Sequence, residues 1–127
     1  MDTGNNPAKN YSENYQSGPL SFEFFFKGKK LITNSGYFQD HNHQLNSISK
    51  STAAHSTLIL DNTSTCNFKK NSKGPSLVTK GLKTFDNEVT YEKNYWGIKC
   101  SHDGYLSRYG VIPVSYTHLT LPTTMLV

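Results

Sequence analysis

The stretch Leu20-Ser-Phe-Glu-Phe-Phe-Phe26 decides the fold class of this chain. All of its even-numbered residues are apolar and two of the three odd-numbered ones are polar, which is the period of a half-buried β-strand. The short turn Lys27-Gly28-Lys29 follows, and Lys30-Leu-Ile-Thr33 returns as an apolar partner. The pattern therefore predicts an antiparallel β-hairpin at this point of the chain.

Further short segments between turn residues predict more strands. These segments are Thr57–Leu60, Ser76–Lys83, Val89–Glu92, Tyr95–Ser101 and Tyr105–Ile112. Long stretches at helical period are missing, and seven Phe and eight Tyr suit a half-buried sheet. We predict an all-β fold, an antiparallel β-sandwich, with an irregular lead-in over 1–17, the sandwich domain over 18–112 and a separate tail over 113–127.

The overall composition does not identify a binding partner. The net charge of +4 over 127 residues is mild, so a polyanionic partner is permitted. The lysines are scattered and no aromatic-basic RNA-binding motif occurs, so we expect no nucleic-acid partner. The chain contains no signal peptide and no apolar membrane span, so we expect no membrane partner. Cys66 and Cys100 are too far apart for metal spacing, which leaves a disulfide or two buried thiols open.

His55 is the first candidate functional residue. It lies in Ser51-Thr-Ala-Ala-His55-Ser-Thr-Leu-Ile-Leu-Asp61, where a loop of small residues meets an apolar run. Functional side chains often lie where a loop joins a rigid element. A histidine that only satisfies loop backbone groups explains the same spacing.

His41 and His43 are two residues apart in the polar segment 39–51, which reads as a loop. Such a pair could bind a metal, but only Asp40 lies nearby as a further ligand. We therefore expect a solvated loop rather than a metal site.

The tail needs separate treatment. Val114-Ser-Tyr-Thr-His-Leu-Thr-Leu-Pro-Thr123 resembles, over ten consecutive residues, the translation of a transposase adapter used to build sequencing libraries. Residues 114–127 also lack charged side chains, unlike the rest of the chain. We expect 113–127, including His118, to be non-native and the natural sequence to end near Ile112.

An ordered set of motifs in the body of the chain resembles the heparinase II/III-like polysaccharide lyases, at the start of their C-terminal β-domain. The motifs are Gly18-Pro-Leu-Ser-Phe-Glu23, Gly28-Lys-Lys-Leu-Ile-Thr-Asn-Ser-Gly36, Ser51-Thr-Ala-Ala-His-Ser-Thr-Leu58, Asp61, His102-Asp-Gly-Tyr105 and Arg108-Tyr-Gly-Val111. The resemblance implies a helical toroid before this domain, with the sugar chain bound between the two. It also implies bacterial parents in the periplasm or cell envelope, acting on glycosaminoglycan or alginate.

The implied chemistry is β-elimination of a uronate-containing polysaccharide. A base removes the C5 proton, the substrate carboxylate is neutralised, and an acid protonates the leaving oxygen. By this resemblance His55 is the catalytic candidate of the β-domain, while Lys50 and Tyr37 are substrate-binding candidates. Lys50 stands where relatives often place an arginine, so it would meet the anionic substrate without bidentate geometry.

The chain also departs from the pattern of its relatives. Their His-x-His-x-Asp run is replaced here by Asn14, Gln16 and Gly18. The metal that some relatives hold would meet Gln16, Asn34 and His55, and neutral amides are poor Zn²⁺ ligands. We therefore expect no metal and no cofactor.

Two functions remain in view. The first is the β-domain of a polysaccharide lyase, a fragment that is inactive without its helical domain and whose partner is an acidic polysaccharide. The alternative is a non-catalytic carbohydrate-binding or structural β-module that shares only the scaffold.

Overall fold

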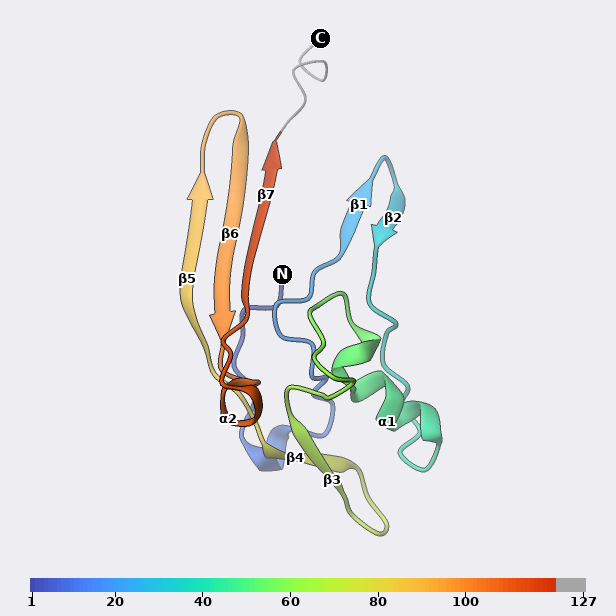
Figure 1. Cartoon of the computed structure of the whole chain (residues 1–127). Coiled ribbons are helices and arrows are strands. Elements are labelled where there is room, and N and C mark those ends of the chain that lie inside the picture. The colour runs from blue at the N-terminus through green and yellow to red at the C-terminus, as the bar shows by residue number, and fades with distance from the viewer. Residues whose placement is uncertain (121–127) are drawn as a thin grey trace.

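The computed structural model describes residues 1–120 and consists mainly of antiparallel strands (Figure 1). The strands are β1 (Phe24–Phe26), β2 (Lys29–Ile32), β3 (Asn67–Lys70), β4 (Ser76–Lys80), β5 (Thr84–Tyr91), β6 (Tyr95–His102) and β7 (Val114–Thr120). The helices are η1 (Lys9–Tyr11), α1 (Gln44–Lys50), η2 (Thr52–Ala54) and α2 (Leu106–Tyr109). The chain is an all-β domain with few short helices, as predicted.

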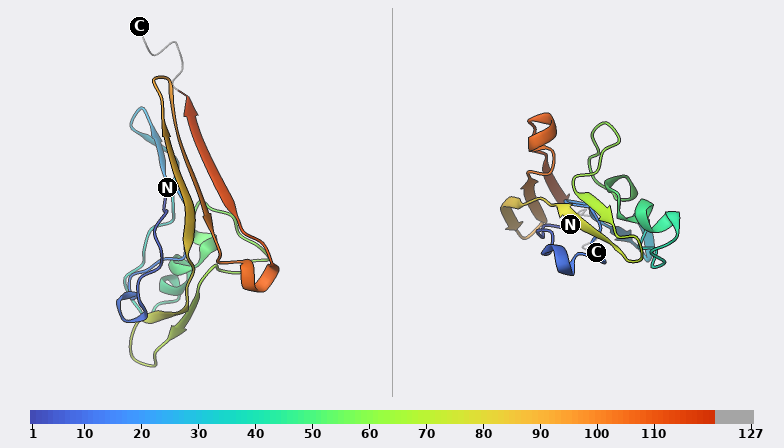
Figure 2. Two further views of the ribbon diagram at one scale, coloured as in Figure 1. Left: turned by 90° about the vertical axis from the view of Figure 1, so that its left-hand side faces the viewer. Right: turned by 90° about the horizontal axis from the view of Figure 1, so that it is seen from below.

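The strands form three sheets: β1-β2, β3-β4 and β5-β6-β7. The three-stranded sheet and the β1-β2 hairpin extend in the same direction, while α1, β3 and β4 lie at the opposite end (Figures 1 and 2). Between hairpin and sheet lies an apolar cleft of about 540 Å³, lined by Phe22, Phe24 and Ile32 on one side and Trp96 and Ile98 on the other.

The β1-β2 hairpin forms where the sequence predicts it. Its turn is Lys27-Gly28, and both residues have positive φ, 48° and 74°. That backbone defines a type I′ turn, whose twist matches the flanking strands. The first strand is shorter than predicted, because Leu20 has φ 63° and Phe22 bonds to the Ser56 side chain rather than to a strand.

The predicted strand Thr57–Leu60 is wrong. The segment contributes only a single bridge, between Leu60 and Thr63. Thr57 N–H donates to His55 O, and Leu60 N–H donates to the Tyr105 hydroxyl, so neither group is available to a strand partner. Leu58 is also half exposed, so the apolar run is not a buried one.

Helix α1 replaces the predicted loop over 39–51. His43 begins the helix as its N-cap, accepting the Leu45 N–H on Nδ1. The face that α1 buries is polar, consisting of Asn46, Ser49 and Lys50. The apolar periodicity by which amphipathic helices are recognised is therefore absent.

Helix α2 replaces the predicted strand Tyr105–Ile112. Gly110 ends the helix in the left-handed conformation, at φ 69°, and donates its N–H to Leu106 O. Tyr105 lies immediately before α2 and Tyr109 is its last residue, and their two rings pack edge to face.

Strand β7 occupies the first half of the tail assigned a non-native origin. It pairs with β6 from Val114, opposite Ser101, to Thr120, opposite Tyr95. A strand pairs through backbone groups that any sequence without proline supplies. The pairing is therefore compatible with either origin, and Leu121–Val127 lie outside the described residues.

The interior holds a cluster of hydroxyl groups that joins three distant segments. Ser17 Oγ and Thr65 Oγ1 lie 2.6 Å apart, and Thr52 Oγ1 donates to the Ser17 carbonyl at 2.6 Å. Thr65 N–H donates to Thr52 Oγ1, and Cys66 N–H donates to Ser17 Oγ. All four residues are buried, so the cluster fixes η2 between the lead-in and the chain before β3.

Cys66 and Cys100 are both free and buried. Burial raises the pKa of each thiol, so both are held as neutral thiols. Within residues 1–120, no helix is long and apolar enough to cross a membrane.

Candidate functional site

His55 lies immediately after the 3-10 helix η2, in extended backbone. Its Nδ1 lies 2.8 Å from the Ser51 carbonyl oxygen. A carbonyl oxygen only accepts, so Nδ1 carries the proton and donates. The neutral ring therefore keeps its lone pair on Nε2, the atom that can take a proton or meet a ligand.

Gln16 is the neighbour of that second nitrogen. His55 Nε2 lies 3.4 Å from Gln16 Oε1, while Gln16 Nε2 is buried without a hydrogen-bond partner. Turning the amide by 180° brings its NH₂ group to the imidazole lone pair and satisfies both groups. The unturned amide suits the protonated ring instead, so Gln16 can serve either state of His55.

Gly18 sets the position of the imidazole ring. A Cβ atom built on Gly18 would lie 2.6 Å from His55 Cδ2 and 2.7 Å from Cγ. Any side chain at this position would displace the ring, so close packing on bare backbone holds His55 in place.

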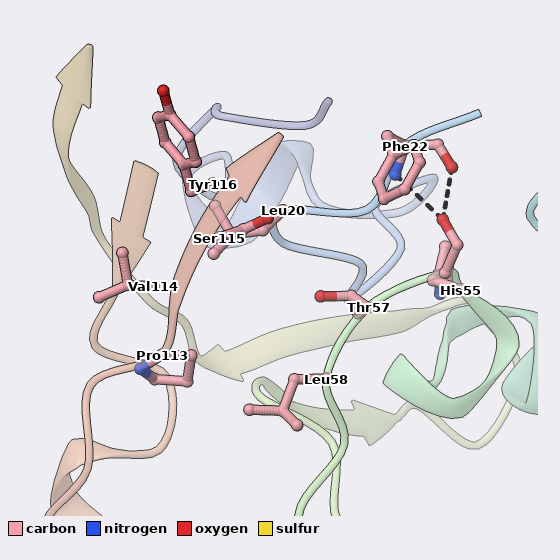
Figure 3. A pocket seen from close by; sticks show the side chains of 10 residues that line it. Leu20, Phe22, His55, Thr57, Leu58, Pro113, Val114, Ser115 and Tyr116 are labelled. Carbon is pink, nitrogen blue, oxygen red and sulfur yellow. Dashed lines mark hydrogen bonds between the residues drawn. The ribbon is translucent and has the colours of Figure 1, made fainter. Parts of the chain in front are cut away.

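His55 lines an open pocket of about 590 Å³ (Figure 3). The lead-in to β1 and the residues following His55 form one wall, which includes Leu20, Phe22 and Thr57. The other wall is Pro113 and the first three residues of β7. The pocket therefore depends in part on the segment whose native origin the sequence puts in question.

Ser56 connects the histidine to the β1-β2 hairpin. Its hydroxyl donates to Phe22 O at 2.5 Å and accepts the Phe22 N–H at 3.0 Å, the two dashed lines of Figure 3. Its own N–H donates to Asn34 Oδ1 at 2.9 Å. One residue next to His55 thus binds both the incoming and the outgoing leg of the hairpin.

Lys50 does not face this pocket. Its side chain is 1% exposed, and Nζ donates to Glu13 O at 2.5 Å and Ser76 O at 2.8 Å. The ammonium also lies 5.5 Å from the centre of the Phe68 ring. Burial lowers the pKa of Lys50, and its ammonium group binds two backbone carbonyls in place of the predicted substrate. Its observed role is to join the lead-in to β4.

Tyr37 lies in a different pocket, of about 560 Å³, together with Glu13, Asn14 and His41. His41 Nε2 pairs with Glu13 Oε1 at 3.1 Å, and Asn46 Nδ2 donates to the Tyr37 hydroxyl. The sequence does not predict this polar group, because Glu13 and His41 are far apart in the chain and no motif links them. The structure thus brings Gln16 and Asn34 to the His55 region, but neither Lys50 nor Tyr37.

The residues near His55 do not fit the metal that the family resemblance implies. Asn34 Oδ1 already accepts the Ser56 N–H and lies 3.3 Å from the Ser56 hydroxyl. Gln16 and Asn34 are neutral amides, and within residues 1–120 no three His, Cys, Asp or Glu side chains are grouped to hold an ion. His43, which sequence spacing linked to His41, caps α1 instead.

The fold and the site together define an antiparallel β-domain that carries one positioned histidine at an open pocket. The family model "Heparinase II/III-like, C-terminal" matches residues 1–115, and the chain belongs to this family of polysaccharide lyase domains. No curated protein and no solved structure gives a significant match.

Proposed function

We propose that this domain supplies His55 to the β-elimination of a uronate-containing polysaccharide. The observation that carries the proposal is the orientation of the ring: the Ser51 carbonyl holds Nδ1–H, and Nε2 is left as the functional nitrogen. A fixed tautomer is what a proton-transfer group needs, because the reacting atom is then defined before substrate arrives.

The roles follow from the two states that Gln16 can serve. As a neutral base, Nε2 assists removal or relay of the C5 proton; as imidazolium, it holds the substrate carboxylate and stabilises the developing enolate charge. Substrate would replace Gln16 at Nε2, and the amide would turn away. The main base and acid belong to the helical domain of the same protein, so this chain alone would not cleave substrate.

The substrate class in this proposal is an acidic polysaccharide such as glycosaminoglycan or alginate. The basic net charge supports attraction to such a polymer. We also propose a bacterial parent protein in the periplasm or cell envelope, where such polymers are met. Family membership supports the lyase assignment, while substrate and compartment rest on the resemblance.

The test is His55→Ala in a protein that carries both domains, with release of unsaturated uronates followed by ultraviolet absorbance. We expect turnover to fall about 100-fold or more, the usual worth of a positioned acid–base group. His43→Ala is the matched control, because that histidine caps α1 away from the pocket. Normal turnover and stability in His55→Ala would contradict the proposal and favour a non-catalytic carbohydrate-binding or structural module.

A further inference from the structure

The turn of the β1-β2 hairpin concentrates positive charge. Lys27, Lys29 and Lys30 lie within four residues, and no acidic residue occurs between Phe24 and Gln39. The ion pairs of residues 1–120 join His41 to Glu13 and Lys99 to Glu88, so none of these three lysines takes part in one. All three side chains are exposed, and Lys30 also attracts the Glu23 carboxylate just before β1.

Two of these lysines lie over exposed aromatic rings. Lys30 Nζ is 5.2 Å from the centre of the Phe25 ring, and Lys27 Nζ is 5.5 Å from that of Phe26. Phe25 is 52% exposed and Phe26 41% exposed. Cation–π contact keeps the ammonium groups near the ring faces. The tip of the hairpin, residues 25–30, therefore combines apolar rings with cations. Such a surface suits a polymer that has both apolar sugar faces and acidic groups.

The turn holds a lysine in an unfavourable conformation. Lys27 has φ 48°, in the left-handed region that Gly, Asn and Asp adopt more readily. An asparagine there would favour the same turn. Lysine at this strained position is explained if its charge is used there, since backbone strain is often retained at functional sites.

The β1-β2 hairpin is attached by hydrogen bonds to the residue next to His55. Ser56 bonds to Phe22 before β1 and to Asn34 after β2, so both legs start at the residue beside the histidine. From Phe22 to Lys27 is five residues, or roughly 16 Å at the rise of a strand. An extended polymer bound at the pocket can therefore reach the tip.

We propose that the β1-β2 hairpin is a second binding site for acidic polysaccharide, at which Lys27, Lys29 and Lys30 bind carboxylate or sulfate groups several sugars away from the pocket. The identity of the ligand rests on the proposed function. The two contacts lie on one polymer, so binding at the tip raises the effective concentration of the chain at His55.

The test removes three lysines from each of two hairpins of this chain, so that the change in net charge is the same. The variant Lys27→Gln/Lys29→Gln/Lys30→Gln removes the tip lysines, and the control Lys69→Gln/Lys70→Gln/Lys73→Gln removes three lysines from the β3-β4 hairpin. Binding of the full chain to long and short alginate oligomers is measured over a range of salt, with dextran as a neutral polymer. Lys29→Gln alone, which disturbs neither ring contact, guards against misfolding of the triple variant.

We expect the tip variant to weaken binding of long alginate about tenfold or more, and to lower the salt slope of log affinity by about one for each lysine. Short oligomers should lose much less, and the control should match the wild type. Wild-type binding in the tip variant would overturn this inference alone. No binding of any acidic polysaccharide by the wild type would overturn the proposed substrate class as well. Tighter binding of single-stranded DNA than of alginate would overturn the ligand assignment.

Discussion

His55 Nδ1 donates to the carbonyl oxygen of Ser51, four residues earlier, at 2.8 Å. The bond closes the η2 turn and fixes which ring nitrogen carries the proton. Two other histidines show the opposite arrangement: His43 Nδ1 accepts the Leu45 N–H and His102 Nδ1 accepts the Gly104 N–H. In one chain, then, backbone groups select two different tautomers.

This contrast gives a spectroscopic prediction. At a pH where all three rings are neutral, ¹⁵N NMR should show His55 as the Nδ1–H tautomer and His43 and His102 as Nε2–H. The two groups are controls for each other within one sample. An Nε2–H signal from His55 would remove the positioned lone pair on which its proposed role depends.

Lys50 should be a structural cation. Lys50→Met leaves the Glu13 and Ser76 carbonyls without their donor, so we expect the free energy of unfolding to fall by about 1–3 kcal/mol. Chemical denaturation measures the loss, and Lys69→Met at an exposed position is the control. Because the ammonium is buried, alginate binding of the folded variant should be unchanged; a selective loss of binding at normal stability would restore Lys50 to the substrate site.

Gly18→Ala should disturb His55 directly. The new Cβ would lie 2.6 Å from the ring, so the imidazole must shift, and overpacking of this kind costs about 1–3 kcal/mol of stability. In a protein that joins this domain to the proposed helical domain, we also expect a lower kcat. Gly74→Ala is the matched control, since its Cβ meets nothing closer than 3.8 Å. Equal effects of the two changes would show that the ring has room to move.

His102 should make stability depend on pH. It is fully buried, and desolvation lowers its pKa despite the opposing charge of Asp103. The unfolded chain, with a histidine pKa of about 6.5, then binds the proton more readily than the folded chain does. The contribution of neutral His102 to folding stability is complete above the unfolded-state pKa and is lost as the pH falls towards the folded-state pKa.

Denaturation midpoints measured from about pH 7 to pH 5 should therefore decline. His102→Asn should flatten this part of the curve, because its side-chain oxygen takes the place of Nδ1, can still accept the Gly104 N–H and carries no titratable group. A decline of the same size in His102→Asn would assign the pH dependence to other groups.

The sequence predicts the elements whose local pattern alone determines their structure. The β1-β2 hairpin follows from alternation and a lysine–glycine turn, and β6 differs from its prediction by a single residue, His102. Helix α1 has no apolar periodicity from which it could be predicted, because it buries an amide, a hydroxyl and an ammonium group rather than hydrocarbon. The apolar composition of Thr57–Leu60 predicts a buried strand, but composition does not reveal that the backbone groups of this segment bond elsewhere.

The candidate site divides in the same way. The family resemblance groups Gln16, Asn34 and His55, and the structure places Gln16 beside the ring and Asn34 beside Ser56. The position of the Lys50 ammonium group depends on two carbonyls from distant segments, and no local sequence pattern predicts these contacts. The grouping of Tyr37, Glu13 and His41 likewise arises only from tertiary folding.

The buried Ser17, Thr52 and Thr65 hydroxyls have a thermodynamic consequence. Exposure of apolar surface raises the heat capacity on unfolding, whereas exposure of polar surface lowers it. An interior built partly on hydroxyl groups should therefore give a small heat-capacity change for its length and a flat stability curve. Cooling should lower the stability of such a domain only slightly, because the hydrophobic effect, which weakens on cooling, supplies only part of that stability.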